Sequence, residues 1–147
     1  MASQLLRKLG LVALIASIAA CGGKPSAVPA SAVDSMQSTE ITAGTGPAIA
    51  AGQTAVVQYT GWLYEVSAPD NKGKQFDSSR TGGQPFRFVV GGGQVIKGWD
   101  QGVVGMKIGG RRRLIIPAEL AYGDRGAGGV IPPGAALVFD IDLIAIE

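Results

Sequence analysis

A glycine-rich segment at residues 91–110, GGGQVIKGWDQGVVGMKIGG, carries the clearest helical periodicity of this chain. Its apolar residues recur at spacings of three and four, which places them on one face of a helix of about three turns. They are Val95, Ile96, Trp99, Val103 and Met106. Gly98 and Gly102 weaken such a helix by about 1 kcal/mol each relative to alanine, and the outer glycines suit turns at its ends. The segment therefore predicts one short helix bounded by turns.

Four other segments, all beyond residue 45, have the composition or the alternation of β-strands. Residues 54–64 (TAVVQYTGWLY) are rich in β-branched and aromatic side chains, and residues 85–90 (PFRFVV) alternate apolar and polar positions. Residues 111–117 (RRRLIIP) end at a proline, and residues 136–147 alternate apolar side chains with two aspartates. These patterns predict an α+β domain in which an antiparallel sheet carries one short helix on one face.

The spacing of the glycines does not match a nucleotide-binding loop. A P-loop needs Lys and then Ser or Thr directly after its last glycine, where this chain has Trp99 and Asp100. A dinucleotide-binding fingerprint needs a third glycine where this chain has Ile96. The glycines instead suit helix capping and tight turns. Trp99 is then either an ordinary core residue or, with the other aromatic residues that stand beside turns, part of a small apolar pocket.

The chain has no histidine and a single cysteine, Cys21. Catalytic triads, Cys–His pairs, histidine-ligated metals and cysteine-rich zinc sites therefore lack their parts, and no disulfide can form within the chain. We expect neither a metal nor a cofactor, and a hydrolase or metalloenzyme has no motif to support it.

The first residues have the pattern of a bacterial export signal. Arg7 and Lys8 precede an apolar run that is too short to span a membrane, and the run ends in Ile-Ala-Ala-Cys21. This ending is similar to the lipoprotein box, in which cleavage precedes a cysteine that becomes lipid-modified; a plain signal peptide with an incidental cysteine is the alternative. The predicted organisation is a signal at 1–20, a flexible tether rich in Gly, Pro and Ser at 21–44, and a folded domain at 45–147.

The charge balance gives no sign of a nucleic-acid partner. Two of the thirteen basic residues lie in the predicted signal, which leaves eleven basic and eleven acidic residues after cleavage. The remaining basic cluster, at residues 111–113, is predicted to lie on a solvated strand edge.

From about residue 47 to the end, the motifs resemble those of the FKBP-type peptidyl-prolyl cis-trans isomerases. They are VQYTGWL, FDSSR, PFRFVVGGGQVIKGWDQGVVGMKIGGRRRLIIPAELAYG and GVIPPGAALVFDIDLI, in the order of the family. The resemblance implies a bent antiparallel sheet wrapping one short helix, with a proline-binding pocket between them.

The resemblance also implies roles for individual residues. Trp99 would form the pocket floor, the backbone N–H of Ile96 would donate to a substrate carbonyl, and Tyr122 and Asp77 would be the catalytic polar groups. The apolar walls and edges that it implies are Tyr59, Phe76, Phe86, Val95, Val130, Ile131 and Phe139. Core packing is the alternative explanation for most of these residues, and for Phe139 above all.

Three departures from better-known members put substrate preference and macrolide affinity in question. The link between Gly61 and Phe76 is longer, so we expect an extra surface loop within residues 62–75. Ala127 stands where some relatives carry a histidine, and Gly82 stands where some carry an arginine that braces the Tyr and Asp of the site.

The expected function is catalysis of X–Pro bond rotation during the folding of secreted or envelope proteins, without covalent chemistry. A proline-binding module or holdase chaperone without important catalysis is the alternative. The expected partners are proline-containing polypeptides, macrolide ligands of the family and a membrane reached through the lipid anchor. The expected location is the bacterial cell envelope, on the periplasmic side. Because Gly22 is not the aspartate of an inner-membrane retention signal, the outer membrane is favoured if there are two.

Overall fold

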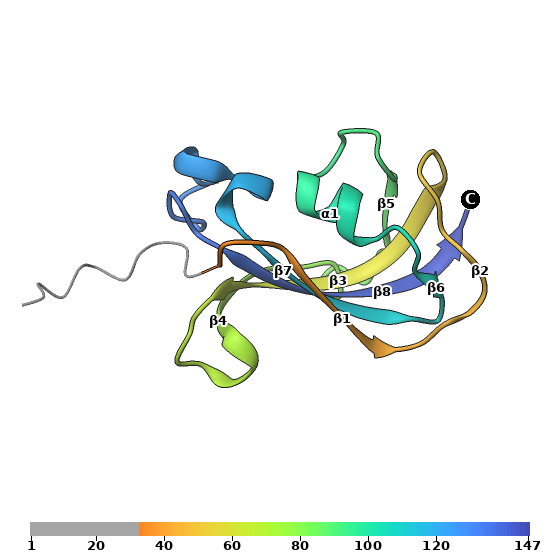
Figure 1. Cartoon of the computed structure of the whole chain (residues 1–147), viewed down its shortest axis with the longest axis horizontal. Helices are drawn as coiled ribbons and strands as arrows, with labels where there is room; N and C mark the ends of the chain where they lie inside the picture. Colours follow the sequence, from red (N-terminus) through yellow and green to blue (C-terminus); the bar gives the residue numbers. More distant parts are fainter. Residues whose placement is uncertain (1–32) are drawn as a thin grey trace, which may run out of the picture.

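The computed structural model describes residues 33–147, so the predicted signal, Cys21 and the first part of the predicted tether lie outside it. Within these residues one α-helix lies over a β-sheet (Figure 1). No helix among them is long and apolar enough to span a membrane. The elements are β1 (Gln37–Thr42), β2 (Thr45–Ala48), β3 (Thr54–Tyr64), β4 (Lys72–Ser78), β5 (Phe86–Val89), α1 (Lys97–Gly102), β6 (Lys107–Ile108), β7 (Arg111–Ile116) and β8 (Leu137–Ile146), with short 3-10 helices η1 (Pro69–Asn71), η2 (Ala118–Leu120) and η3 (Gly123–Arg125).

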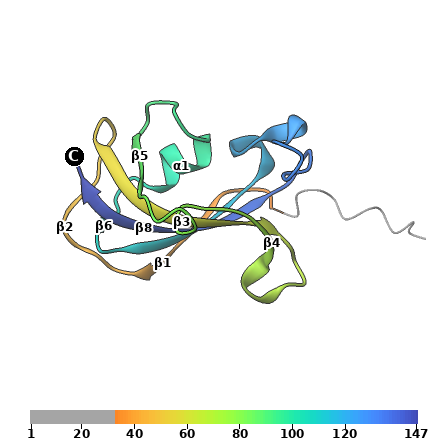
Figure 2. The same cartoon turned by 180° about the vertical axis from the view of Figure 1, so that it is seen from behind.

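The main sheet is antiparallel and runs in the order β1-β7-β8-β3-β4, while β5 also pairs with β3. β2 and β6 form a separate two-stranded ribbon. Figure 2 shows from behind how the sheet curves around the side that carries α1. β3 pairs with β8 along most of its length, but its other neighbour changes from β5 at residues 54–57 to β4 at residues 60–64. Tyr59 lies at this change of neighbour.

The four predicted strands are confirmed as β3, β5, β7 and β8, with bounds that differ by at most one residue at either end. β8 shows the predicted alternation, because Phe139, Ile141 and Leu143 are buried in the core while Asp140 and Asp142 face the other way. The predicted architecture, an antiparallel sheet with one short helix on one face, is confirmed as well.

The helix is shorter than its periodicity predicts, with six residues rather than about three turns. Val95 and Ile96 precede it, and Met106 lies in the turn that follows. The Asp100 side chain accepts hydrogen bonds from the backbone N–H groups of Gly91 and Gly93, at 2.9 and 3.1 Å. These bonds hold residues 91–96 as a loop against the helix. The periodicity nevertheless identified buried residues, since Trp99, Val103 and Met106 all belong to the core.

The two glycines inside α1 allow the helix to lie directly on β7. A Cβ at Gly98 would be 2.5 Å from Ile116, and one at Gly102 would be 2.6 Å from Leu114. Both partners are fully buried side chains of β7. Glycine has a low helical propensity, but at these two positions it permits close contact between the helix and the sheet.

The structured part begins before residue 45, which corrects the predicted boundary. β1 lies within the predicted tether but pairs with β7 from Gln37 to Thr42. All six side chains of β1 are exposed, so the strand leaves no apolar alternation in the sequence. β1 also corrects the interpretation of the arginines at 111–113, because β7 lies between β1 and β8 rather than at an edge.

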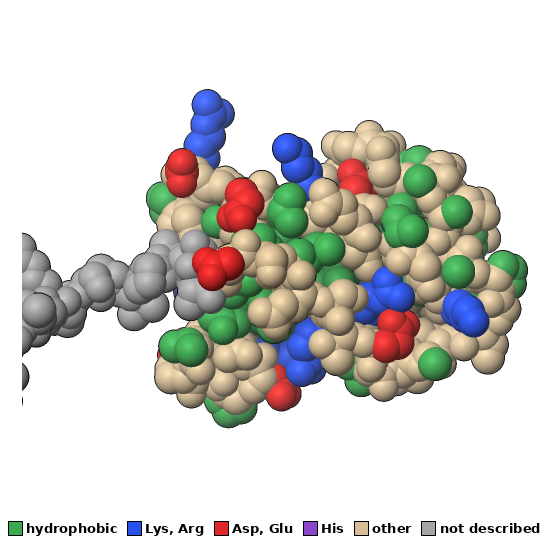
Figure 3. Space-filling model, viewed as in Figure 1, with side chains coloured by type: hydrophobic (Ala, Val, Ile, Leu, Met, Phe, Trp, Pro, Cys, Tyr) green, Lys and Arg blue, Asp and Glu red, His purple; other side chains and the backbone are tan. Residues whose placement is uncertain are grey.

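The face of the sheet opposite α1 is held by ion pairs that involve these arginines. Asp140 pairs with Arg113 and Lys72, at 2.7 and 2.8 Å. Asp142 pairs with Arg111 at 2.7 Å and also with Arg80. Acidic and basic side chains are likewise interspersed over the side of the molecule seen in Figure 3.

The packing of α1 on β7 leads to a stability prediction for Gly98→Ala. Alanine favours the helix by about 1 kcal/mol, but overpacking a dense core costs about 1–3 kcal/mol. Because several atoms of buried Ile116 stand in the way, we expect a net loss of about 1–2 kcal/mol in the free energy of unfolding, measured in urea. Gly82→Ala is the control, since an added Cβ there meets nothing within 4 Å. Equal or higher stability of Gly98→Ala would show that the contact does not require glycine.

Candidate functional site: an aromatic pocket between the helix and the sheet

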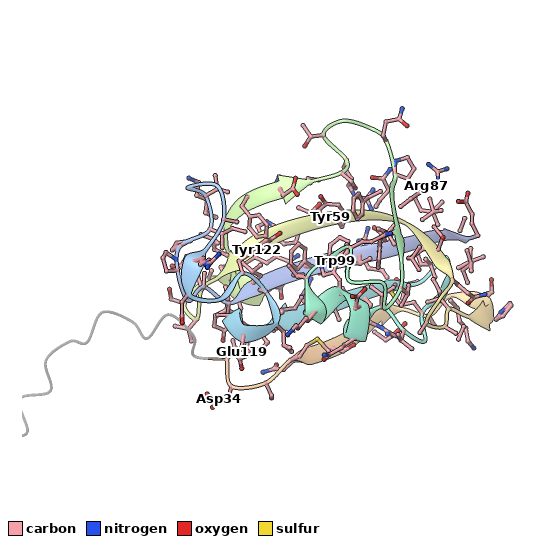
Figure 4. All side chains as sticks on the ribbon, turned by 90° about the horizontal axis from the view of Figure 1, so that it is seen from above. Asp34, Tyr59, Arg87, Trp99, Glu119 and Tyr122 are labelled. Carbon is pink, nitrogen blue, oxygen red and sulfur yellow. The ribbon has the colours of Figure 1, made fainter. Side chains whose placement is uncertain are left out.

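A cavity of about 160 Å³ opens between α1 and the sheet. Six of its lining residues come from the strands and the helix already described, and the other four come from loops. The lining residues are Tyr59, Phe76, Asp77, Phe86, Gln94, Val95, Ile96, Trp99, Tyr122 and Phe139. Figure 4 shows Tyr59, Trp99 and Tyr122 gathered between the helix and the sheet, whereas Asp34, Arg87 and Glu119 lie toward the periphery.

Trp99 is the centre of the aromatic cluster and forms the floor of the cavity. Its ring lies 4.8 Å from that of Tyr59 and 5.2 Å from that of Phe139, at interplanar angles of 81° and 86°. Phe86 meets it at 6.0 Å and 77°. Edge-to-face contacts of this kind are favourable beyond the area they bury. The indole Nε1 is buried without a hydrogen-bond partner among the described residues.

Gly61 makes room for two of the walls. A Cβ at this position would lie 2.7 Å from both the Phe139 ring and the Phe76 ring. These rings meet each other at 5.6 Å and 89°. Steric crowding therefore requires glycine at position 61 of β3, because any side chain there would displace both rings.

The polar groups gather at one side of the cavity, where β3 changes neighbour. The Tyr59 hydroxyl donates a 2.6 Å hydrogen bond to Asp77 on β4. Burial, and then this bond, raise the pKa of Tyr59 far above its ordinary value. Burial and the nearby charge of Asp77 also raise the pKa of Tyr122. Both phenols are therefore neutral hydrogen-bond donors throughout the neutral pH range.

The Ile96 backbone offers a further donor. Ile96 precedes the first turn of α1, and its C=O accepts from the N–H groups of Trp99 and Asp100. Its own N–H makes no hydrogen bond within the described residues. Since backbone N–H groups are seldom left unpaired when buried, this half-buried N–H at the cavity edge is suited to a carbonyl of a bound molecule.

Two of the site residues implied by the resemblance lie elsewhere. Ile131 is 5% exposed and belongs to the core, where it forms a bridge with Ala127. Val130 sits on the intervening turn, 48% exposed, and does not line the cavity. Two backbone hydrogen bonds join residues 127 and 131 across the turn. In this turn the Ile131 side chain enters the core, and the Val130 side chain lies in solvent.

One lining residue was missed from the sequence. Gln94 lines the cavity, and its Oε1 accepts a 3.0 Å hydrogen bond from the Val89 backbone N–H. This bond ties the loop to β5. Its position directly before Val95 could have indicated this role, but the sequence analysis selected only apolar and aromatic residues for the walls of the pocket.

The three departures from better-known members have clear structural positions. The long link between Gly61 and Phe76 extends β3 and β4 as a hairpin, whose loop at 65–71 contains η1. Ala127 is half-buried and packs against the core. Gly82 faces open space. Among residues 33–147 no group of three or more acidic, histidine or cysteine residues could hold a metal ion.

Comparisons with known proteins agree with this geometry. Residues 46–144 match the family described as FKBP-type peptidyl-prolyl cis-trans isomerase. An FK506-binding protein of Streptomyces anulatus is 55% identical over 108 residues, covering 73% of this chain and 82% of the relative. The peptidyl-prolyl cis-trans isomerase FPR2 of Saccharomyces cerevisiae is 52% identical over 96 residues, covering 65% and 67%. The crystal structure of FkpA from Escherichia coli superposes with a TM-score of 0.66 at 40% identity, covering 76% of this chain and 48% of that one.

Two phenylalanines that line the cavity differ in burial, so their replacement by alanine should have different effects on stability. Phe139 is 3% exposed within the core, whereas Phe86 is 38% exposed. We expect Phe139→Ala to lower the free energy of unfolding by about 3–5 kcal/mol. Phe86→Ala should cost only about 1 kcal/mol, because much of its ring already contacts solvent. Chemical denaturation followed by circular dichroism measures both, and equal losses would contradict the described burial.

Proposed function

The chain belongs to the FKBP-type peptidyl-prolyl cis-trans isomerases, and we propose how its pocket accelerates rotation about X–Pro bonds. The observation that carries the mechanism is an aromatic cavity whose edge carries two hydrogen-bond donors, the Tyr122 hydroxyl and the Ile96 backbone N–H. The relatives are named FK506-binding proteins, and we propose that the same cavity takes macrolide ligands of that type.

Rotation about the X–Pro bond breaks no covalent bond, so it needs neither a nucleophile nor proton transfer. The barrier of about 18–20 kcal/mol comes from the amide resonance that is lost as the bond twists. The planar amide is more dipolar than the twisted one, and water stabilises the planar form more. A cavity of aromatic rings therefore binds the twisted form in preference to the planar one, and this difference lowers the barrier.

The polar groups would fix the geometry of the twisted bond. With the proline ring on Trp99, the Ile96 N–H would hold a substrate carbonyl at the helix side. The Tyr122 hydroxyl would donate to the rotated X–Pro carbonyl at the opposite side. Asp77, held by Tyr59, would orient the neighbouring groups and shape the local electric field.

The absence of proton transfer leads to a prediction for the pH dependence of the rate. The raised pKa values of Tyr59 and Tyr122 keep both hydroxyls protonated, so kcat/KM should be flat from about pH 6 to about pH 9. Asp77→Asn should lower kcat/KM by roughly ten-fold or less, because it retains the shape of the side chain. A proline peptide assayed by NMR exchange measures both. A bell-shaped profile, with no activity in a folded Asp77→Asn variant, would point to acid–base chemistry at this carboxylate.

We also propose that the protein works at the bacterial cell envelope on secreted proteins as they fold. The support is the lipoprotein-like ending at Cys21, which lies outside the described residues. About twelve residues separate Cys21 from Val33, enough to span at most about 40 Å when extended. This length would hold the domain close to a membrane surface while its cavity remains accessible. The outer membrane is favoured if the cell has two.

The anchor leads to a prediction for Cys21→Ser. Because two or more acyl chains hold a protein firmly on a membrane and one holds it only weakly, we expect the variant to move from the membrane fraction to the soluble fraction. Its isomerase activity should be unchanged, since the cavity is formed entirely by residues beyond 58. Fractionation of cells that express each form is the measurement. An unchanged membrane fraction would exclude lipidation of Cys21 as the anchor.

A further inference from the structure

Asp77 differs from the other acidic residues on the strands of the main sheet, which all form ion pairs. It is the one charged side chain that lines the cavity, and among the described residues it forms no ion pair. Asp140 and Asp142 on β8 each pair with two cations. The hydrogen-bond donors to Asp77 are neutral: the Tyr59 hydroxyl at 2.6 Å and the Ser78 backbone N–H at 2.8 Å. Its negative charge at the cavity is therefore not balanced by a neighbouring cation.

The space beside this carboxylate is open. Asp77 and Tyr122 are both exposed, although each lines the cavity. No lysine or arginine is among the residues that line the cavity, and none lies within ion-pair distance of Asp77 among the described residues. The charge is available to a cation brought by a substrate.

We propose that Asp77 forms a subsite for a basic side chain, so that lysine or arginine directly before proline is favoured over a neutral side chain of the same length. The inference rests on the proposed function, in which Tyr122 holds the X–Pro carbonyl. The residue that supplies this carbonyl then lies next to Asp77. Its hydrocarbon stem would pack along the Phe76 and Tyr122 rings, with the charged end at the carboxylate.

The expected preference is modest because the carboxylate is solvent-exposed. Exposed ion pairs typically change an equilibrium by about two- to five-fold. A preference of this origin must also weaken with salt, since the screening length falls from about 10 Å at 0.1 M to about 3 Å at 1 M. Size or shape selection would not respond to salt in this way.

The test compares peptides that differ only at the residue before proline: lysine, acetyl-lysine or glutamate. Acetyl-lysine keeps the length of lysine without its charge, and a protease-free assay keeps the preference of a coupling protease out of the result. For the full chain at low salt, we expect kcat/KM for lysine to exceed that for acetyl-lysine by about two- to five-fold, with glutamate below both. The ratio should approach one at 1 M salt.

Two variants locate the effect. Asp77→Asn should bring the lysine to acetyl-lysine ratio to about one, whatever it does to the absolute rates. Glu119→Gln is the matched control, because it also removes one exposed carboxylate but lies outside the cavity, and it should keep the wild-type ratio. A wild-type ratio of one, or a ratio that survives Asp77→Asn, would overturn the subsite. Failure to turn over any of the peptides would instead contradict the proposed function itself.

Discussion

The close contact between α1 and β7 determines where the site can form. Gly98 lets the helix backbone approach Ile116 to a distance that any side chain would prevent. Trp99 follows directly and is therefore fixed over the concave side of the sheet, where Tyr59 and Phe139 meet its ring. A helix of only six residues has little stability of its own, so its position depends on this packing. The floor of the cavity is thus a consequence of how the helix is attached.

The pairing of β3, the longest strand, also determines where the site forms. Because β5 pairs with its first half and β4 with its second half, the sheet has a gap in pairing near Tyr59. Asp77, at the end of β4, can then accept the Tyr59 hydroxyl, while Phe86 of β5 packs against the other side of the same ring. Tyr59 therefore joins the polar side of the cavity, at Asp77, to its apolar side, at Phe86. On the opposite face, ion pairs of Asp140 and Asp142 connect β8 to β7 and to β4 and leave the concave face to the aromatic side chains.

The sequence predicted the parts of the molecule in which side-chain chemistry and position agree. β8 alternates between core and surface, and Trp99, Tyr122 and Asp77 stand in motifs whose resemblance placed them at the site. Prediction from the sequence failed where hydrogen bonds, rather than the pattern of apolar residues, determine the local structure. Asp100 draws Gly91 and Gly93 into a loop and shortens the helix. β1 carries no buried side chain, so only its pairing with β7 reveals it. Val130 and Gln94 were misjudged because a turn and a backbone hydrogen bond, rather than polarity, decide where their side chains lie.

Asp77 has two proposed roles: it orients groups at the site during catalysis, and it binds a basic side chain of the substrate. Its position at the edge of the cavity allows both. Rotation of an amide transfers no proton, so the carboxylate of Asp77 at the edge of the cavity has no acid–base role to perform. The less exposed carboxylate of Asp140, by contrast, is paired with two cations, Arg113 and Lys72. Asp77 remains hydrated and held by Tyr59, so no internal cation is required. Its charge can therefore act both on the groups around the cavity and on the part of a substrate that extends from the bound proline.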